Sequence, residues 1–231
     1  MQKLLVVFTG AGVSAESGLS TFRDSGGLWC NYNIYDVASP EGWAKDFKLV
    51  LNFYNQRRKN VIEATPNPAH YAIAKLESKY NVYVITQNID DLHERAGSTK
   101  VIHLHGEIRK ARSTINPNLK YEIKGYELNP GDLCELGSQL RPDVVWFGEE
   151  VSLIEEAYKI TRLANCLIII GTSLNVYPAA NIIYVAPPNI PKYFIDPKAS
   201  EIKNIYNLKI INKKASEGVP LLVEKILQEG I

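Results

Sequence analysis

Short apolar runs recur along the chain, and each ends in a polar or glycine-rich turn followed by a helix-like pattern. The runs cover Leu4–Thr9, Val82–Thr86, Leu167–Ile170 and Lys192–Ile195. Runs of this length without polar alternation are typical of strands buried on both faces, as in a parallel sheet covered by helices. The repeated strand–helix order predicts an α/β fold with a Rossmann-like, doubly wound parallel sheet.

Two stretches interrupt this order. Residues 30–63 carry a helical pattern (FKLVLNFYNQRRKNVI), and residues 108–141 include YEIKGYEL, whose alternation around Lys124-Gly125 predicts a β-hairpin. Both favour insertions that build a smaller second lobe. We therefore expect a single domain over residues 1–231, with a large lobe over about 1–30, 64–107 and 142–231 and a small lobe over about 31–63 and 108–141. The C-terminal PLLVEKILQEG predicts an amphipathic closing helix.

The charge balance bears on possible partners. The 231 residues include 26 Lys+Arg and 25 Asp+Glu, a net charge of +1, which argues against DNA or RNA as a primary partner because such binding needs a basic face. No stretch approaches the roughly 20 apolar residues that cross a bilayer, and the first apolar run is too short for a signal-peptide core. We expect a soluble, cytoplasmic chain that does not bind membranes.

The cysteines restrict the kinds of site. Cys30, Cys134 and Cys166 are the only three, they lie far apart, and no C-x-x-C pair occurs. An odd, scattered set excludes a disulfide framework and a four-thiolate zinc site.

A glycine turn follows the first predicted strand. Residues 10–15 (GAGVSA) fit G-x-G-x-x-[G/A], which brings backbone N–H groups close to a pyrophosphate at a helix N-terminus. The same pattern also occurs as a tight turn without a ligand. Ser14, Glu16 and Ser17, followed by Thr21-Phe22-Arg23-Asp24, favour a phosphate and ribose site.

Polar residues follow the second predicted strand. Gln87, Asn88 and Asp90 come just past its carboxyl end, where open α/β sheets bind ligands. Asn88 or Asp90 can alternatively cap the next helix.

Two histidines share one face at strand spacing. His103 and His105 could form a metal pair, but no third ligand is evident. Gly106 leaves one face of the His105 ring open, and an imidazole is a natural general base for a ribose hydroxyl.

Two further segments have alternative interpretations. Tyr54 and Arg57 lie on one helix face and together form a carboxylate receptor, although Arg57 taken alone is more simply a solvated surface charge. Residues 144–149 (VVWFGE) are either core or an edge to which an extended peptide adds as a strand.

Taken together, these segments resemble the sirtuins, the NAD-dependent protein deacylases. The resemblance runs in order along the chain through GAGVSAESG, TFRDSGGLW, TQNIDDLHERAG, HLHG, LRPDVVWFGE, GTSLNVYPAA and KASEGVP. It implies NAD as co-substrate and acylated lysine side chains of proteins as partners.

The resemblance also implies roles for individual residues. It places at NAD Gly10, Ala11, Gly12, Ser14, Ala15, Glu16, Thr21, Phe22, Arg23, Trp29, Gln87, Asn88, Ile89, Asp90, Gly171, Thr172, Ser173, Asp196 and Ala215. It makes His105 the general base and Asn88 a second catalytic residue. It gives Val145, Trp146, Phe147 and Gly148 to the segment that receives the acyl-lysine peptide.

The same resemblance indicates which acyl groups are removed, and it shows one departure from the sirtuin pattern. Tyr54 and Arg57 match the Y-x-x-R pair of sirtuins that remove succinyl and malonyl groups and still deacetylate, and Ala38 matches the small residue that makes room for the longer chain. Most sirtuins hold zinc with four cysteines in the small lobe, whereas residues 108–141 contain only Cys134. We expect no zinc and a lobe held by apolar packing of Ile115, Leu119, Tyr121, Ile123, Tyr126 and Leu128.

The implied reaction transfers the acyl group to ADP-ribose. The acyl oxygen attacks C1′ of the nicotinamide ribose and nicotinamide leaves. His105 then takes a proton from a ribose hydroxyl, whose oxygen attacks the former acyl carbon, and water completes the release of free lysine and O-acyl-ADP-ribose. Two other functions stay open: an NAD hydrolase or ADP-ribosyltransferase with the same pocket, and a catalytically silent NAD-binding module.

Overall fold

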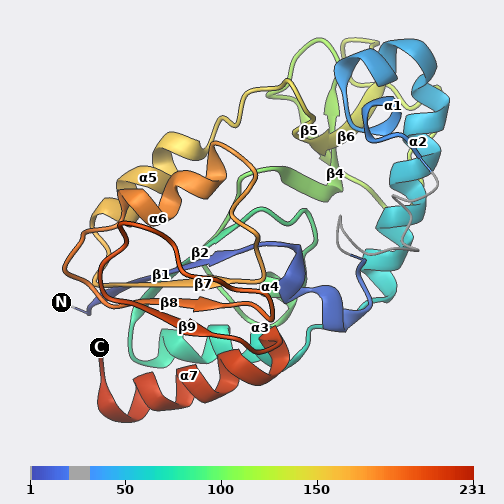
Figure 1. Cartoon of the computed structure of the whole chain (residues 1–231). Coiled ribbons are helices and arrows are strands. Elements are labelled where there is room, and N and C mark those ends of the chain that lie inside the picture. The colour runs from blue at the N-terminus through green and yellow to red at the C-terminus, as the bar shows by residue number, and fades with distance from the viewer. Residues whose placement is uncertain (1, 21–31) are drawn as a thin grey trace.

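A six-stranded parallel sheet forms the larger part of the molecule in the computed structural model, which describes residues 2–20 and 32–231 (Figure 1). In spatial order its strands are β3 (Val101–His103), β2 (Asn81–Thr86), β1 (Leu4–Thr9), β7 (Cys166–Ile170), β8 (Lys192–Ile195) and β9 (Leu208–Ile211). Every neighbouring pair is parallel. The predicted Rossmann-like doubly wound α/β fold is therefore confirmed.

Helices cover both faces of this sheet, which explains the unbroken apolar runs. On one face lie α3 (Pro68–Lys75) and α7 (Ala215–Glu229), and on the other lie α5 (Ile154–Arg162) and α6 (Ile182–Val185) (Figure 1). Along β1, Leu5 and Val7 join the core beneath α3 and α7, whereas Val6 and Phe8 join the opposite core. The predicted closing helix is α7.

The second, smaller sheet is antiparallel and has the order β5-β4-β6, with bounds Lys120–Glu122, Gly106–Ser113 and Leu140–Val144. It packs with α1 (Ile34–Val37) and the long α2 (Pro40–Glu63) (Figure 1). These elements come from the two predicted insertions, although β4 begins two residues before residue 108 and β6 ends three residues after residue 141. The division of residues 1–231 into two lobes of one domain stays a prediction.

The hairpin predicted at Lys124-Gly125 is wrong. The strand that pairs with β5 is β4, and the chain between them runs through residues 114–119. After β5, the Ile123 amide bonds to the Arg109 carbonyl and the Leu128 amide bonds to the Asn55 side chain. Only the first two residues of YEIKGYEL lie in β5; the rest form an irregular segment from which Ile123 and Leu128 turn into the lobe core.

The core of the small lobe also differs from the predicted set. Ile115 is 64% exposed and Tyr126 is 41% exposed, so neither is a core residue. The buried cluster consists of Leu51, Ala111, Ile123, Leu128, Cys134 and Leu140, with Tyr121, Trp43 and Phe47 packed against it. Leu51, Trp43 and Phe47 of α2 contribute to a core that the sequence analysis assigned to side chains of residues 108–141 alone.

Helix length and hydropathy address the membrane question. Within residues 2–20 and 32–231, none of the helices combines the length and apolar character needed to cross a bilayer.

Candidate active site

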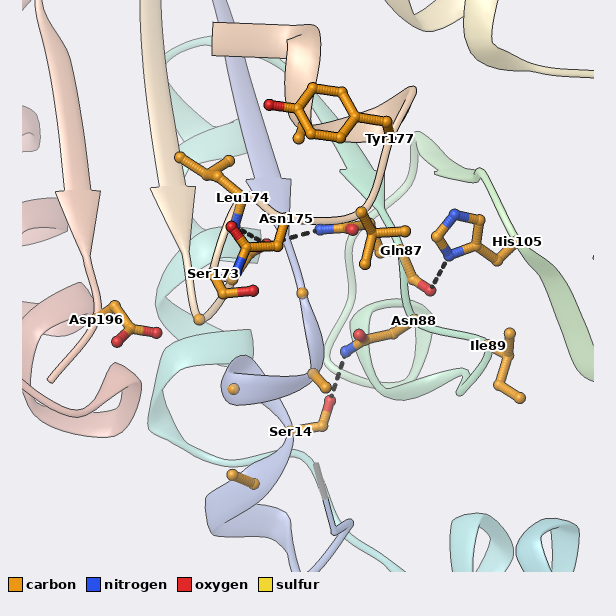
Figure 2. Close-up of a pocket in the computed structure, with 18 of the residues that line it drawn as sticks. Ser14, Gln87, Asn88, Ile89, His105, Ser173, Leu174, Asn175, Tyr177 and Asp196 are labelled. Atoms are coloured by element: carbon orange, nitrogen blue, oxygen red, sulfur yellow. Dashed lines mark hydrogen bonds between the residues drawn. The ribbon is translucent and has the colours of Figure 1, made fainter. Parts of the chain in front are cut away.

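A cleft of about 1490 Å³ opens at the carboxyl ends of β1, β2 and β7 and extends to α2 and the residues after β6. Figure 2 shows Asp196 and His105 on opposite sides of the part of the cleft that it draws, with Ser14 and Asn88 between them. Loops after parallel strands meet at one edge of the sheet, so segments far apart in sequence converge there.

Two backbone turns form the floor of the cleft. The Gly10 amide bonds to the Ile170 carbonyl at 3.0 Å, and the Gly12 amide bonds to the Gly171 carbonyl at 2.8 Å. A Cβ atom on Gly12 would lie only 2.7 Å from the Gly171 Cα. Gly12 therefore allows the turns after β1 and β7 to contact each other, because any side chain there would clash.

Ser14 joins the glycine turn to the residues after β2. Its hydroxyl accepts a hydrogen bond from the Asn88 side-chain amide at 3.1 Å and donates one to Asp90 Oδ2 at 3.1 Å. Burial raises the pKa of Asp90, and the hydrogen bonds from the Leu92 amide and Ser14 oppose that shift. Asp90 Oδ1 also accepts a hydrogen bond from the amide of Leu92, the first residue of α4 (Leu92–Arg95), but the N-cap residue of α4 is Asp91, so neither Asn88 nor Asp90 is the predicted cap.

His105 lies in the turn between β3 and β4. Its Nδ1 is 3.0 Å from the Gln87 carbonyl oxygen, which can only accept, so Nδ1 carries the hydrogen (Figure 2). Burial lowers the pKa of His105, and the bond to Gln87 opposes that shift. The ring is therefore neutral near pH 7, and its Nε2 carries a lone pair.

Gly106 serves a backbone purpose in this turn. Its φ is +80°, and a Cβ atom there would lie 2.1 Å from the Asp143 carbonyl oxygen of β6. The glycine after His105 thus permits close approach of two strands.

The end of the cleft near Asp196 is formed by the turn after β7 and the start of α7. Thr172 Oγ1 accepts hydrogen bonds from the Gln87 side chain and the Leu174 amide at 3.0 and 3.2 Å. Glu16 lines the same wall, but its carboxylate accepts from the backbone and hydroxyl of Ser216 at 2.9 and 2.7 Å. Glu16 therefore fixes the first turn of α7 beside Ala215.

The opposite end contains a phenol and a guanidinium from α2. Tyr54 and the half-buried Arg57 both line the cleft, together with Ala38. Trp146 Nε1 donates a hydrogen bond to the Tyr54 hydroxyl at 3.0 Å. Burial raises the pKa of Tyr54, so the hydroxyl keeps its own proton.

The VVWFGE segment is a strand only as far as Val144, and then becomes an extended loop and a turn. The amides of Val145, Trp146 and Phe147 donate to the His105 carbonyl, Glu149 and the Ala38 carbonyl. Among the described residues, the Gly148 amide has no acceptor. Trp146 is a core residue at 3% exposure, whereas Phe147 is 42% exposed, and the addition of a peptide along this segment stays a prediction.

His103 does not line the cleft. Its ring nitrogens contact the Asn88 carbonyl and Glu94. In the described part of the chain, no group of three or more His, Cys, Asp or Glu side chains is placed to hold a metal ion.

Comparison with known proteins identifies the family. The model of the Sir2 family matches residues 10–178, well over half of the chain. The chain belongs to the Sir2 family.

Sir2-family relatives match nearly the whole length. A protein named NAD-dependent protein deacylase from Helicobacter pylori (strain J99) is 51% identical over 226 residues, covering 98% of this chain and 96% of its own. A protein of the same name from Bacteroides thetaiotaomicron is 50% identical over 230 residues, which cover 97% of this chain and 98% of the relative. A Sir2 homologue solved as an NAD complex has a TM-score of 0.89 at 39% identity, and the match covers 100% of this chain and 91% of the homologue. A Sir2 protein solved with a deacetylated p53 peptide and 3′-O-acetyl-ADP-ribose has a TM-score of 0.82 at 30% identity, and the match covers 99% of this chain and 94% of that protein.

In this Sir2-family chain the cleft gathers every predicted site residue that the structure describes. Thr21, Phe22, Arg23 and Trp29 lie outside the described residues. The cleft also contains residues that the sequence analysis did not name, among them Leu174, Asn175, Val176, Tyr177, Lys198, Lys203 and Lys214. Four of these belong to the GTSLNVYPAA motif, of which only the first three residues had been assigned. Lys214 begins the KASEGVP motif, whereas Lys198 and Lys203 belong to no quoted motif and are brought to the cleft by the fold.

Proposed function

We propose that this chain is an NAD-dependent protein-lysine deacylase that acts in the cytoplasm, prefers succinyl and malonyl groups and also removes acetyl groups. It releases nicotinamide and O-acyl-ADP-ribose. The observation that carries the proposal is the placement of neutral His105 in one cleft with the glycine turn and the Tyr54–Arg57 pair. The names of the relatives at about 50% identity agree with the deacylase part.

The chemistry of the cleft suits NAD. The Asp196 carboxylate would accept from ribose hydroxyls at one end, and the nearby Lys198 and Lys214 supply positive charge for the diphosphate. Asn88 and Asp90, held through Ser14, would position the nicotinamide ribose. NAD supplies a ribose carbon that exchanges nicotinamide for the acyl oxygen. Holding both substrates in line with each other provides much of the rate enhancement.

His105 would act as the general base. Its Nδ1–H is held by the Gln87 carbonyl, which directs the lone pair of Nε2 away from Gln87. That nitrogen would take the proton of a ribose hydroxyl, so that the hydroxyl oxygen attacks the acyl carbon. Because the pKa of His105 is lowered, the base form persists at mildly acidic pH.

The acyl preference is assigned to α2. Because the Tyr54 hydroxyl accepts from Trp146 and keeps its proton, it would donate to the distal carboxylate of a succinyl or malonyl group. Arg57 would pair with the same carboxylate. Burial lowers the pKa of Arg57, and an anionic acyl group would offset that desolvation.

The deciding experiment measures nicotinamide release from NAD with succinylated, acetylated and unmodified forms of one lysine peptide. We expect release to require an acyl group and to be fastest with succinyl. Equal release without any acyl group would favour the NAD-hydrolase function. Binding of NAD without turnover would favour the silent NAD-binding module.

A further inference from the structure

His103 is held by two groups that can only accept hydrogen bonds. The ring is 8% exposed, with Nδ1 3.0 Å from the Asn88 carbonyl oxygen and Nε2 2.7 Å from Glu94 Oε1. A carbonyl and an ionised carboxylate both lack a proton to give. Both ring nitrogens must therefore carry hydrogen, and the ring is an imidazolium.

The Glu94 side chain is ionised, as the ion pair with His103 requires. This side chain is 40% exposed, which keeps the carboxylate hydrated on one side. Burial acts to raise the pKa of Glu94, but the hydrogen bond and charge of His103 outweigh it and lower the pKa. The ion pair thus consists of a buried cation and a partly hydrated anion.

The ion pair is part of a wider attachment of the residues after β2. Three successive carbonyls there accept from one neighbouring segment: Gln87 from the His105 ring, Asn88 from the His103 ring, and Ile89 from the Ile108 amide at 2.8 Å. Only the Asn88 carbonyl is held by a charged group. The Asn88 side chain then reaches Ser14 from this fixed backbone (Figure 2).

We propose that His103, charged and held by Glu94, is a positioning residue that fixes Asn88 for NAD. The inference rests on the proposed deacylase function, in which the Asn88 side chain positions the nicotinamide ribose. His103 itself has no nitrogen left for chemistry, in contrast to His105. Its role differs from the metal pair considered from the sequence, since a protonated ring cannot bind a metal ion.

Loss of the His103 proton at higher pH would break its ion pair with Glu94. Burial acts to lower the pKa of His103, but the hydrogen bond and charge of Glu94, the Asn88 carbonyl and the charge of Glu107 on β4 together raise it above its ordinary value. The other titratable groups facing it are His93 on α4 and Asp90. Stabilisation by the ion pair is therefore present below about pH 6.5 and is lost as pH rises through the raised pKa. Removing the Glu94 charge leaves only the Asn88 carbonyl and the charge of Glu107 to oppose burial, which lowers the pKa of His103 and moves that loss to lower pH.

The test compares Glu94→Gln with Glu107→Gln. Both remove one negative charge near His103, but only Glu94 accepts a hydrogen bond from it, whereas Glu107 bonds to Lys110. For Glu94→Gln we expect kcat/KM for NAD to fall roughly tenfold near pH 7, the size of one charge-assisted hydrogen bond, and to recover as the pH is lowered and the His103 ring gains its proton. Glu107→Gln should shift the pH profile much less, because the charge of Glu107 is the smallest of the effects that raise the pKa of His103. A loss in Glu94→Gln that is equal at all pH values would overturn the proposal.

A second measurement is independent of turnover. Long-range ¹H–¹⁵N NMR of the imidazoles, with His103→Gln to assign the signals, reports which ring nitrogens are protonated. We expect both His103 nitrogens to carry hydrogen near pH 7 in the wild-type chain and one of them in Glu94→Gln. A neutral His103 in the wild type would refute the inference even if the enzyme deacylates. If the wild type shows no NAD-dependent deacylation, the proposed function fails, while the NMR result and the NAD affinity of the two variants still decide the role of His103.

Discussion

The indole nitrogen of Trp146 lies 3.0 Å from the Tyr54 hydroxyl oxygen and donates a hydrogen bond to it. The two residues are 92 positions apart in sequence, and both are almost completely buried. A phenol that accepts from an indole has its own hydrogen available for a second partner. Trp146 therefore determines in which direction Tyr54 can donate.

Removing that indole donor should weaken recognition of an acidic acyl group. Trp146→Phe keeps an aromatic ring but loses the N–H, so we expect desuccinylation kcat/KM to fall roughly three- to tenfold relative to deacetylation, as for one hydrogen bond. Tyr54→Phe removes the partner hydroxyl. The double variant should lose no more succinyl preference than Tyr54→Phe alone, and simple additivity would contradict the coupling.

Arg57 should dominate the preference for acidic groups. Arg57→Met should lower kcat/KM for a succinylated peptide at least roughly thirtyfold more than for an acetylated one, since losing one partner of a buried charge pair costs about 2 kcal/mol or more. Lys59→Met provides the matched control, because this neighbouring cation is exposed and lies outside the cleft. Equal loss of both activities in Arg57→Met would refute the assigned role.

Acid should destabilise the fold through two neighbouring buried histidines. The His70 and His93 rings lie 4.9 Å apart, centroid to centroid, and both are fully buried. Burial lowers the pKa of His70 to about 4, and burial together with the charges of His70 and His103 lowers that of His93 well below its ordinary value. Because each group binds a proton more readily when unfolded, stability should fall from about pH 6.5 towards pH 4, by about 1.4 kcal/mol per pH unit per group.

The variant His70→Gln isolates one of these groups. His70 is the third residue of α3 and completes its capping box, a place where glutamine serves equally well. Urea unfolding between about pH 4 and pH 6.5 should show a shallower loss of stability in the variant. Identical slopes for variant and wild type would exclude His70 as a cause.

The small lobe should fold without zinc. Its core is formed by apolar side chains and Cys134, whose thiol bonds to Ser113 and Ser138. We expect the thermal unfolding temperature to be unchanged by a strong zinc chelator, and elemental analysis of the purified protein to find no stoichiometric metal. As a positive control, Leu140→Ala should destabilise by about 2–4 kcal/mol. A chelator-induced drop in unfolding temperature would disprove the prediction.

Local patterns predicted much of the molecule. The apolar runs located β1 and β8 at their observed bounds, because strands buried on both faces must be apolar throughout. The polar residues after them converge in the cleft because parallel strands all end at one edge. The hairpin at Lys124-Gly125 failed, since antiparallel partners are chosen by long-range pairing and side-chain packing.

The amino-acid sequence by itself thus determined the parallel sheet, the glycine turn and the residues gathered around them, since these depend on local chemistry and on the order of strands and helices. Only the tertiary structure decided that His103 is a buried cation and His105 a neutral ring, although the two share a tetrapeptide. The same holds for the direction in which Tyr54 donates. The state of a proton depends on burial and on the partners of each nitrogen or oxygen, and those partners are brought from distant segments by folding.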